Sequence, residues 1–133
     1  MKLNFESRFA VNPKEAKQMN TEDLRENFLI EKLFTANEIH LTLSHYDRYI
    51  AGGAMPVNQK LALPNPDNLK ANYFLERREI GMINVGGKGI VSADGEQDEI
   101  DYKEAVYLGK GTKEVLFESV DANNPAKFYL NSA

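Results

Sequence analysis

Short β-type runs that end at turn-forming residues fill most of this chain and constrain its fold more than any other feature. After Asn27 these runs are rich in branched or aromatic residues and are separated by Gly, Pro, Asn and Asp. With no helical pattern between them, they predict an antiparallel sandwich or barrel, best described as a jelly roll. The predicted strands cover residues 28–34, 38–44, 48–50, 55–63, 72–76, 80–85, 89–92, 97–100, 105–108, 115–119 and 127–130.

The first part of the chain carries helix-start signals instead. Asn12 stands before Pro13, and Thr21 stands before two acidic residues, which are arrangements that cap helices. We expect short helices at about residues 13–18 and 21–27. The predicted fold is therefore mainly β, with one or two short N-terminal helices.

The length of 133 residues is about that of one domain. We predict a single domain over residues 1–133, in which a helical segment at 1–27 packs on a β-sandwich at 28–133. The clearest hairpin turn is at Asp94 and Gly95, because both residue types tolerate the positive φ angles of tight hairpins.

The composition argues against several kinds of function. No apolar run approaches the roughly 20 residues that span a bilayer, and the N-terminus lacks the apolar stretch of a signal peptide. We therefore expect a cytoplasmic protein without a membrane partner. The absence of cysteine excludes disulfides, thiolate nucleophiles and sulfur-ligated metals. A net charge of -4, with acids and bases interspersed, gives no extended basic surface for nucleic acid.

The two histidines, His40 and His45, are candidates for a site. On one continuous strand they point to opposite faces, so they could not hold one metal ion. The apolar face places His40 on the polar side and His45 on the core side, as defined by Ile39, Leu41 and Leu43. Structural roles explain both rings, and the functional alternative is that His45, beside Asp47 and Arg48, reaches a cleft.

A run of four charged residues, Glu76-Arg77-Arg78-Glu79, offers a second candidate site. As a strand it places Glu76 and Arg78 on one face and Arg77 and Glu79 on the other. Cross-strand ion pairs would explain this pattern without function. Alternatively, one face lines a barrel mouth, where an arginine holds a substrate carboxylate with two hydrogen bonds. The candidate catalytic residues are therefore His45, Arg48, Arg77 and Glu79.

The spacing of Glu79 and Gly86 resembles the end of the first conserved block of cupins. That block reads His, one residue, His, three or four residues, Glu, six residues, Gly. The two histidine positions fall here on Asn72 and Phe74, or on Tyr73 and Leu75. In the second block, Glu114 stands where a metal-binding histidine would be. The resemblance thus implies a cupin fold without the imidazole ligands that a transition metal favours.

Several segments together resemble the 5-keto-4-deoxyuronate isomerases, also called 4-deoxy-L-threo-5-hexosulose-uronate ketol-isomerases. The match extends from about Leu24 to Asn131, and the order and spacing of its blocks make it specific. The blocks are Ser44-His45-Tyr46-Asp47-Arg48, Gly52-Gly53-Ala54-Met55-Pro56, Tyr73-Phe74-Leu75-Glu76-Arg77-Arg78-Glu79, Ile83-Asn84-Val85-Gly86-Gly87-Lys88-Gly89, Tyr107-Leu108-Gly109-Lys110-Gly111 and Pro125-Ala126-Lys127-Phe128-Tyr129.

The resemblance implies a bacterial enzyme of pectin and uronate degradation with two cupin-like halves, assembled as a homo-oligomer, often a hexamer. It implies conversion of 5-dehydro-4-deoxy-D-glucuronate to 3-deoxy-D-glycero-2,5-hexodiulosonate, with zinc held by three His and one Glu of the second half. Because this chain resembles the first half, the expected partners are the C-terminal cupin half and a small uronate substrate. None of the zinc ligands has a position here, so we expect this segment to bind no zinc and to be non-catalytic by itself.

Two alternatives belong to other classes of function. Tyr46, Tyr49, Tyr73 and Phe74 lie near charged residues, which is typical of a carbohydrate-binding jelly roll without catalysis. The altered metal positions in a preserved barrel pattern also fit an assembly module.

Overall fold

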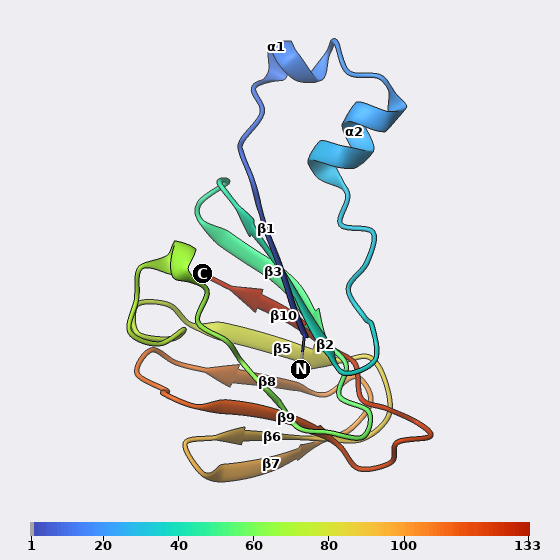
Figure 1. The fold of residues 1–133 in the computed structure, drawn as a ribbon, viewed down its shortest axis with the longest axis vertical. Coiled ribbons are helices and arrows are strands. Elements are labelled where there is room, and N and C mark those ends of the chain that lie inside the picture. The colour runs from blue at the N-terminus through green and yellow to red at the C-terminus, as the bar shows by residue number, and fades with distance from the viewer. Residues whose placement is uncertain (1) are drawn as a thin grey trace.

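The computed structural model describes residues 2–133 and contains two facing β-sheets with a helical extension (Figure 1). The larger sheet has six strands in the order β1-β2-β3-β10-β5-β8, and the smaller has four in the order β4-β9-β6-β7. The strands are β1 (Lys2–Arg8), β2 (Glu38–Ser44), β3 (Tyr49–Ala54), β4 (Leu61–Ala62), β5 (Ile80–Asn84), β6 (Gly89–Ala93), β7 (Glu96–Ile100), β8 (Ala105–Leu108), β9 (Val115–Ser119) and β10 (Phe128–Ser132).

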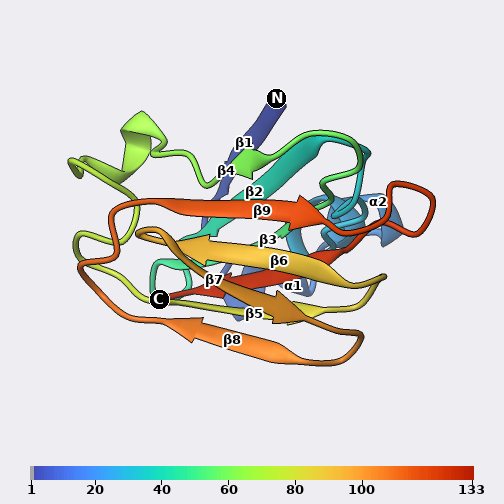
Figure 2. The same ribbon diagram turned by 90° about the horizontal axis from the view of Figure 1, so that it is seen from below.

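The predicted antiparallel, mainly β fold is confirmed by this topology, with one parallel pairing between β1 and β2. Figure 2 shows β9, β6 and β7 of the smaller sheet lying over the strands of the larger one. The predicted hairpin at Asp94 and Gly95 is also confirmed, since it joins β6 to β7 with φ angles of 48° and 90°. No helix within residues 2–133 is both long and apolar enough to cross a membrane.

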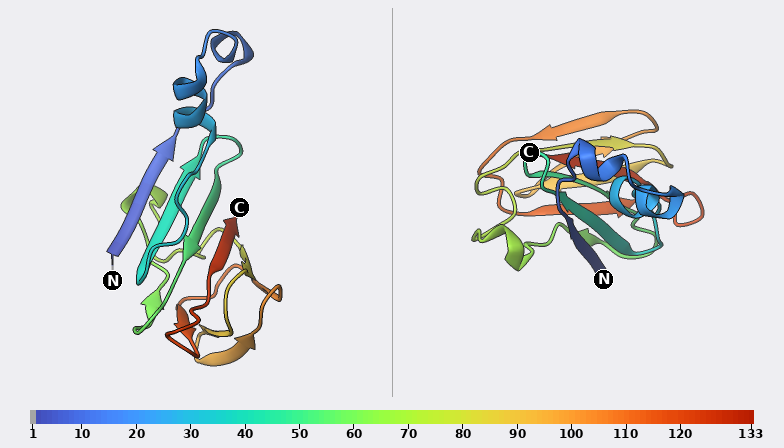
Figure 3. Two further views of the ribbon diagram at one scale, coloured as in Figure 1. Left: turned by 90° about the vertical axis from the view of Figure 1, so that its right-hand side faces the viewer. Right: turned by 90° about the horizontal axis from the view of Figure 1, so that it is seen from above.

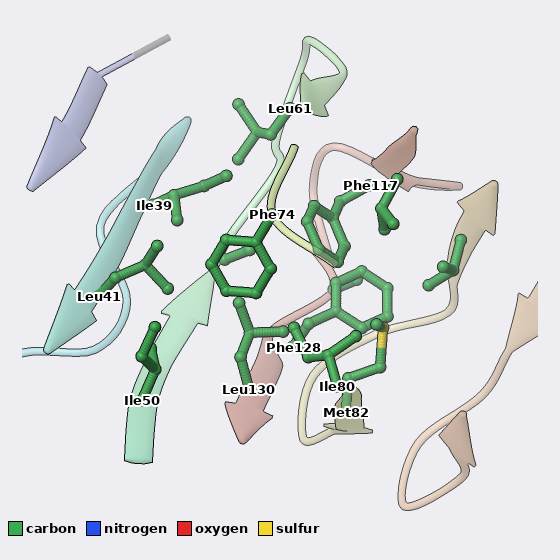
Figure 4. Close-up of a cluster of buried hydrophobic side chains, with 14 of the residues drawn as sticks. Ile39, Leu41, Ile50, Leu61, Phe74, Ile80, Met82, Phe117, Phe128 and Leu130 are labelled. Carbon is green, nitrogen blue, oxygen red and sulfur yellow. The ribbon is translucent and has the colours of Figure 1, made fainter. Parts of the chain in front are cut away.

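A hydrocarbon core fills the space between the two sheets (Figure 4). Alternation along the strands creates it: Ile80 and Met82 of β5 are buried, as are Phe128 and Leu130 of β10. The Phe117 and Phe128 rings lie 5.5 Å apart between the sheets. Each such side chain contributes about 1.5–3 kcal/mol on burial, so this core holds the sandwich together.

The helices α1 (Pro13–Ala16) and α2 (Thr21–Phe28) lie close to the predicted positions, but they project beyond the sheets (Figures 1 and 3). Neither helix has a buried residue. The structure thus differs from the expected helical segment that packs on the sandwich. The N-terminal strand β1 explains part of the difference, because Leu3 and Phe5 alternate and pack against the core.

Three predicted strands are wrong or shortened. Residues 28–34 form no strand, because Phe28 ends α2 and the following segment has no ladder partner. Only the two residues of β4 form a strand within 55–63. Residues 72–76 form turns, in which the Asn72 N–H donates to the Glu76 carboxylate at 2.6 Å. Consecutive side chains of a strand point to opposite faces. The turns instead allow both Phe74 and Leu75 to be buried.

Candidate functional site: an arginine-lined pocket

A cavity of about 910 Å³ lies where the β2–β3 turn, the segment after the 3₁₀ helix η1 (Asp67–Leu69) and the end of β10 meet. We call it the arginine pocket. Arg48, Arg77 and Arg78 line it together with His45, so it gathers three of the four candidate residues and adds Arg78. Its remaining lining residues are Leu43, Ser44, Asp47, Asn68, Leu69, Ala71, Phe74 and Ala133.

Arg48 reaches the pocket from a tight turn between β2 and β3. Asp47 and Arg48 have φ angles of 56° and 55°, and the Tyr49 N–H donates to the Tyr46 carbonyl at 3.3 Å. Two successive left-handed residues match the twist of the flanking strands. The left-handed region costs a residue such as arginine about 1–2 kcal/mol, so the turn holds Arg48 at a local energetic cost. The Arg48 side chain has no hydrogen bond or ion pair within residues 2–133.

Arg78 is fixed from several sides. Its Nε donates to Ser132 Oγ at 2.8 Å, and its Nη2 donates to the carbonyls of Arg48 and Ser132 at 2.6 and 3.2 Å. The guanidinium also lies 5.8 Å from the centre of the Phe74 ring. Burial lowers the pKa of Arg78, although an arginine remains charged in proteins. It therefore places a half-buried, well-oriented positive charge at the pocket wall.

Arg77 closes the other side of the pocket. Its Nη2 donates to the Leu69 carbonyl at 3.1 Å and to the Lys70 carbonyl. The strand interpretation, which put Arg77 and Arg78 on opposite faces, is wrong because residues 72–79 form turns and bends rather than a strand. Strand alternation does not bring Arg78 next to Arg77, whereas the structure places both on the wall of one pocket.

His45 lies at the pocket edge rather than on the core side. The strand β2 ends at Ser44, so alternation no longer sets the direction of the His45 side chain. The ring is exposed and stacks on Phe9, with centres 4.6 Å apart. His40 is separate from this site: its Nε2 lies 3.0 Å from Thr35 Oγ1 and 3.9 Å from a Glu38 carboxylate oxygen.

Glu79 does not line the arginine pocket. Its carboxylate accepts a hydrogen bond from the Tyr107 hydroxyl at 2.5 Å, and this bond raises the pKa of Tyr107. The backbone of Glu79 pairs with Ala133 and continues the ladder between β5 and β10, with N–H···O distances of 2.9 and 3.2 Å. Both contacts give Glu79 a structural role, and its catalytic role stays a prediction.

The residues at the cupin metal positions do not form a zinc site. Asn72 is exposed, Phe74 is packed in the core, and Glu114 is exposed just before β9, where its N–H donates to Asp94. Among residues 2–133, no three His, Cys, Asp or Glu side chains gather where they could hold a metal ion. The core between the sheets is lined by hydrocarbon instead (Figure 4). The donor set present in this part of the chain does not fit zinc.

The fold places the chain among cupin-type jelly rolls. The cupin domain of Schizosaccharomyces pombe Cnp3 matches with a TM-score of 0.54 and 10% identity, over 71% of this chain and 62% of that one. An RmlC-like cupin protein from Desulfovibrio desulfuricans matches with a TM-score of 0.50 and 11% identity, over 71% and 79%. These similarities concern the fold alone. No family model matches the sequence.

Curated relatives are much closer in sequence, and they are named 4-deoxy-L-threo-5-hexosulose-uronate ketol-isomerase. The protein of Lachnoclostridium phytofermentans is 56% identical over 97% of this chain, and that of Formosa agariphila is 53% identical over all of it. These alignments cover 47% and 48% of the relatives, so the chain spans about half their length. The chain is thus a homologue of this isomerase family over about half the length of its members, which confirms the resemblance found in the sequence.

Proposed function

We propose that this chain is the N-terminal part of a 4-deoxy-L-threo-5-hexosulose-uronate ketol-isomerase, a cytoplasmic enzyme of pectin and uronate degradation. The identity of 53–56% along nearly the whole chain carries this proposal. The intact protein would convert 5-dehydro-4-deoxy-D-glucuronate to 3-deoxy-D-glycero-2,5-hexodiulosonate. Residues 1–133 would form one cupin-like domain of a protein that assembles as a homo-oligomer, a hexamer by family resemblance.

In this proposal the two halves have different tasks. Interconverting an aldehyde and an adjacent ketone requires a base that moves a proton between neighbouring carbons and an electrophile that stabilises the enediolate oxygen. Residues 2–133 bring together no set of zinc ligands that could act as this electrophile. We therefore place the zinc of the intact enzyme in the other half. Residues 2–133 contribute packing for the intact enzyme and a positively charged surface.

Complementation tests this division directly. The chain is joined to the second half of the Lachnoclostridium phytofermentans relative, and turnover of 5-dehydro-4-deoxy-D-glucuronate is measured for the chain alone, the joined protein and the intact relative. We expect no turnover by the chain alone and turnover by the other two. A joined protein that assembles with the relative's oligomeric state but remains inactive would contradict the proposal.

A further inference from the structure

The arginine pocket carries an unbalanced positive charge. Three arginines line it, and Asp47 is the sole acidic side chain among the described lining residues. Within residues 2–133, none of the three guanidinium groups forms an ion pair, although ion pairs occur elsewhere, as between Lys60 and Glu118. This excess is notable in a chain whose net charge is -4. A concave site lined by one sign of charge attracts ions of the opposite sign.

The hydrogen bonds of two arginines orient them without exhausting their donors. Arg78 uses Nε and Nη2, and Arg77 uses Nη2. The remaining guanidinium nitrogens, Nη1 of Arg78 and Nε and Nη1 of Arg77, have no partner among residues 2–133. Because these arginine side chains are already held in place, they lose less conformational entropy when a ligand accepts their hydrogen bonds.

The other lining groups indicate the class of ligand. The Phe74 ring offers an apolar surface under Arg78, while Ser44 and Asn68 add polar groups. The volume of about 910 Å³ lies within the range of small-molecule sites. A guanidinium group matches the planar geometry of a carboxylate, and hydroxyl groups suit the serine and asparagine side chains.

We infer that the arginine pocket binds a small carboxylate-bearing sugar, of the size of a hexuronate, through Arg77 and Arg78, with Arg48 at its edge. The inference goes beyond the proposed function, because it assigns a ligand site to residues of this chain and binding here requires no turnover.

Calorimetric titration of the protein with D-galacturonate tests this inference, with D-galactose and inorganic phosphate as comparison ligands. D-Galactose has the same ring without the carboxylate, so we expect D-galacturonate to bind and D-galactose to show no binding. We also expect added salt to weaken galacturonate binding. Equal binding of the two sugars, no binding of galacturonate, or tighter binding of phosphate would each overturn the inference.

Four variants locate the binding. Arg77→Gln should weaken galacturonate binding about tenfold or more, because a charge-assisted hydrogen bond is lost. Arg48→Gln should also weaken galacturonate binding. This variant should keep the native fold, because the Arg48 side chain has no partner among residues 2–133. Asp47→Asn should strengthen galacturonate binding by removing the local acid. Lys88→Gln is the matched control, since it removes a charge outside the pocket. If Arg48→Gln and Asp47→Asn change the affinity no more than Lys88→Gln, the inference is wrong.

Discussion

Arg78 is tied to Ser132 by two hydrogen bonds, from Nε to Oγ at 2.8 Å and from Nη2 to the carbonyl at 3.2 Å. These bonds join the turn segment 72–79 to the end of β10, and the Ser132 hydroxyl donates onward to the Glu79 carbonyl at 2.6 Å. Two parts of the chain separated by more than fifty residues thus share one polar network, and its member Arg78 lines the arginine pocket.

Replacing Arg78 should destabilise the fold. In Arg78→Ala the acceptors on the buried Ser132 and on the exposed Arg48 lose their donor, and the contact with Phe74 is lost. We expect the free energy of unfolding to fall by about 1–3 kcal/mol, measured by urea denaturation. Arg25→Ala is the control, because Arg25 forms an exposed ion pair with Glu31, and it should cost about 0–1 kcal/mol. Equal losses in the two variants would contradict the network.

The left-handed backbone of Arg48 predicts that glycine is more stable than alanine at this position. Glycine tolerates the left-handed φ of 55°, whereas alanine keeps the steric penalty. Arg48→Gly should therefore be more stable than Arg48→Ala by about 1 kcal/mol, measured from their thermal unfolding. Both variants remove the same side chain, so the comparison isolates the backbone. An Arg48→Ala variant at least as stable as Arg48→Gly would mean that the turn is not left-handed there.

Two glycines of the larger sheet, Gly52 in β3 and Gly81 in β5, should respond differently to replacement by alanine. A Cβ at Gly52 would lie 2.2 Å from the His40 carbonyl oxygen, so β3 would have to move away from β2. Gly52→Ala should cost about 1–3 kcal/mol or more in unfolding experiments. Gly81 in β5 has no atom within 4 Å of the same position, so Gly81→Ala should be tolerated. Comparable losses at both positions would contradict the close approach of β2 and β3.

The bond between Tyr107 and Glu79 should be visible in a pH titration. This bond raises the pKa of Tyr107 above 10.0, because the Glu79 carboxylate accepts a hydrogen bond from the protonated hydroxyl. The carboxylate charge also repels the phenolate. The folded state therefore holds this proton more tightly than the unfolded state. The resulting stabilisation is complete below pH 10.0 and is lost as the pH rises through the folded-state pKa.

Tyrosinate absorbance, taken as the difference between the protein and Tyr107→Phe, measures this titration. In Glu79→Ala the Tyr107 pKa should move down toward 10.0, because the main cause of the shift is removed. A Tyr107 titration that is the same with and without the Glu79 carboxylate would refute the assignment.

The sandwich was predictable from the sequence because apolar and other residues alternate along β2, β5 and β10. Ile39 and Leu41 are buried as expected, and so are Phe128 and Leu130. Local patterns do not predict β1, although Leu3 and Phe5 also alternate, because each of its residues pairs in parallel with a β2 residue 36 positions later.

The site was only partly predictable. His45, Arg48 and Arg77 were identified as candidates, and the structure places them around one cavity. Their convergence depends on a left-handed turn at Arg48 and on the fold of residues 72–79, and neither follows from local patterns. Strand alternation therefore gave the wrong face for His45 and separated Arg77 from Arg78.

Zinc content is the most direct test of the central claim that this half lacks the catalytic centre. The purified chain is saturated with zinc and dialysed. The zinc content of this sample is then measured by elemental analysis, and its isomerase turnover is measured in parallel. We expect far less than one zinc per chain and no turnover. One tightly held zinc per chain accompanied by turnover would contradict it.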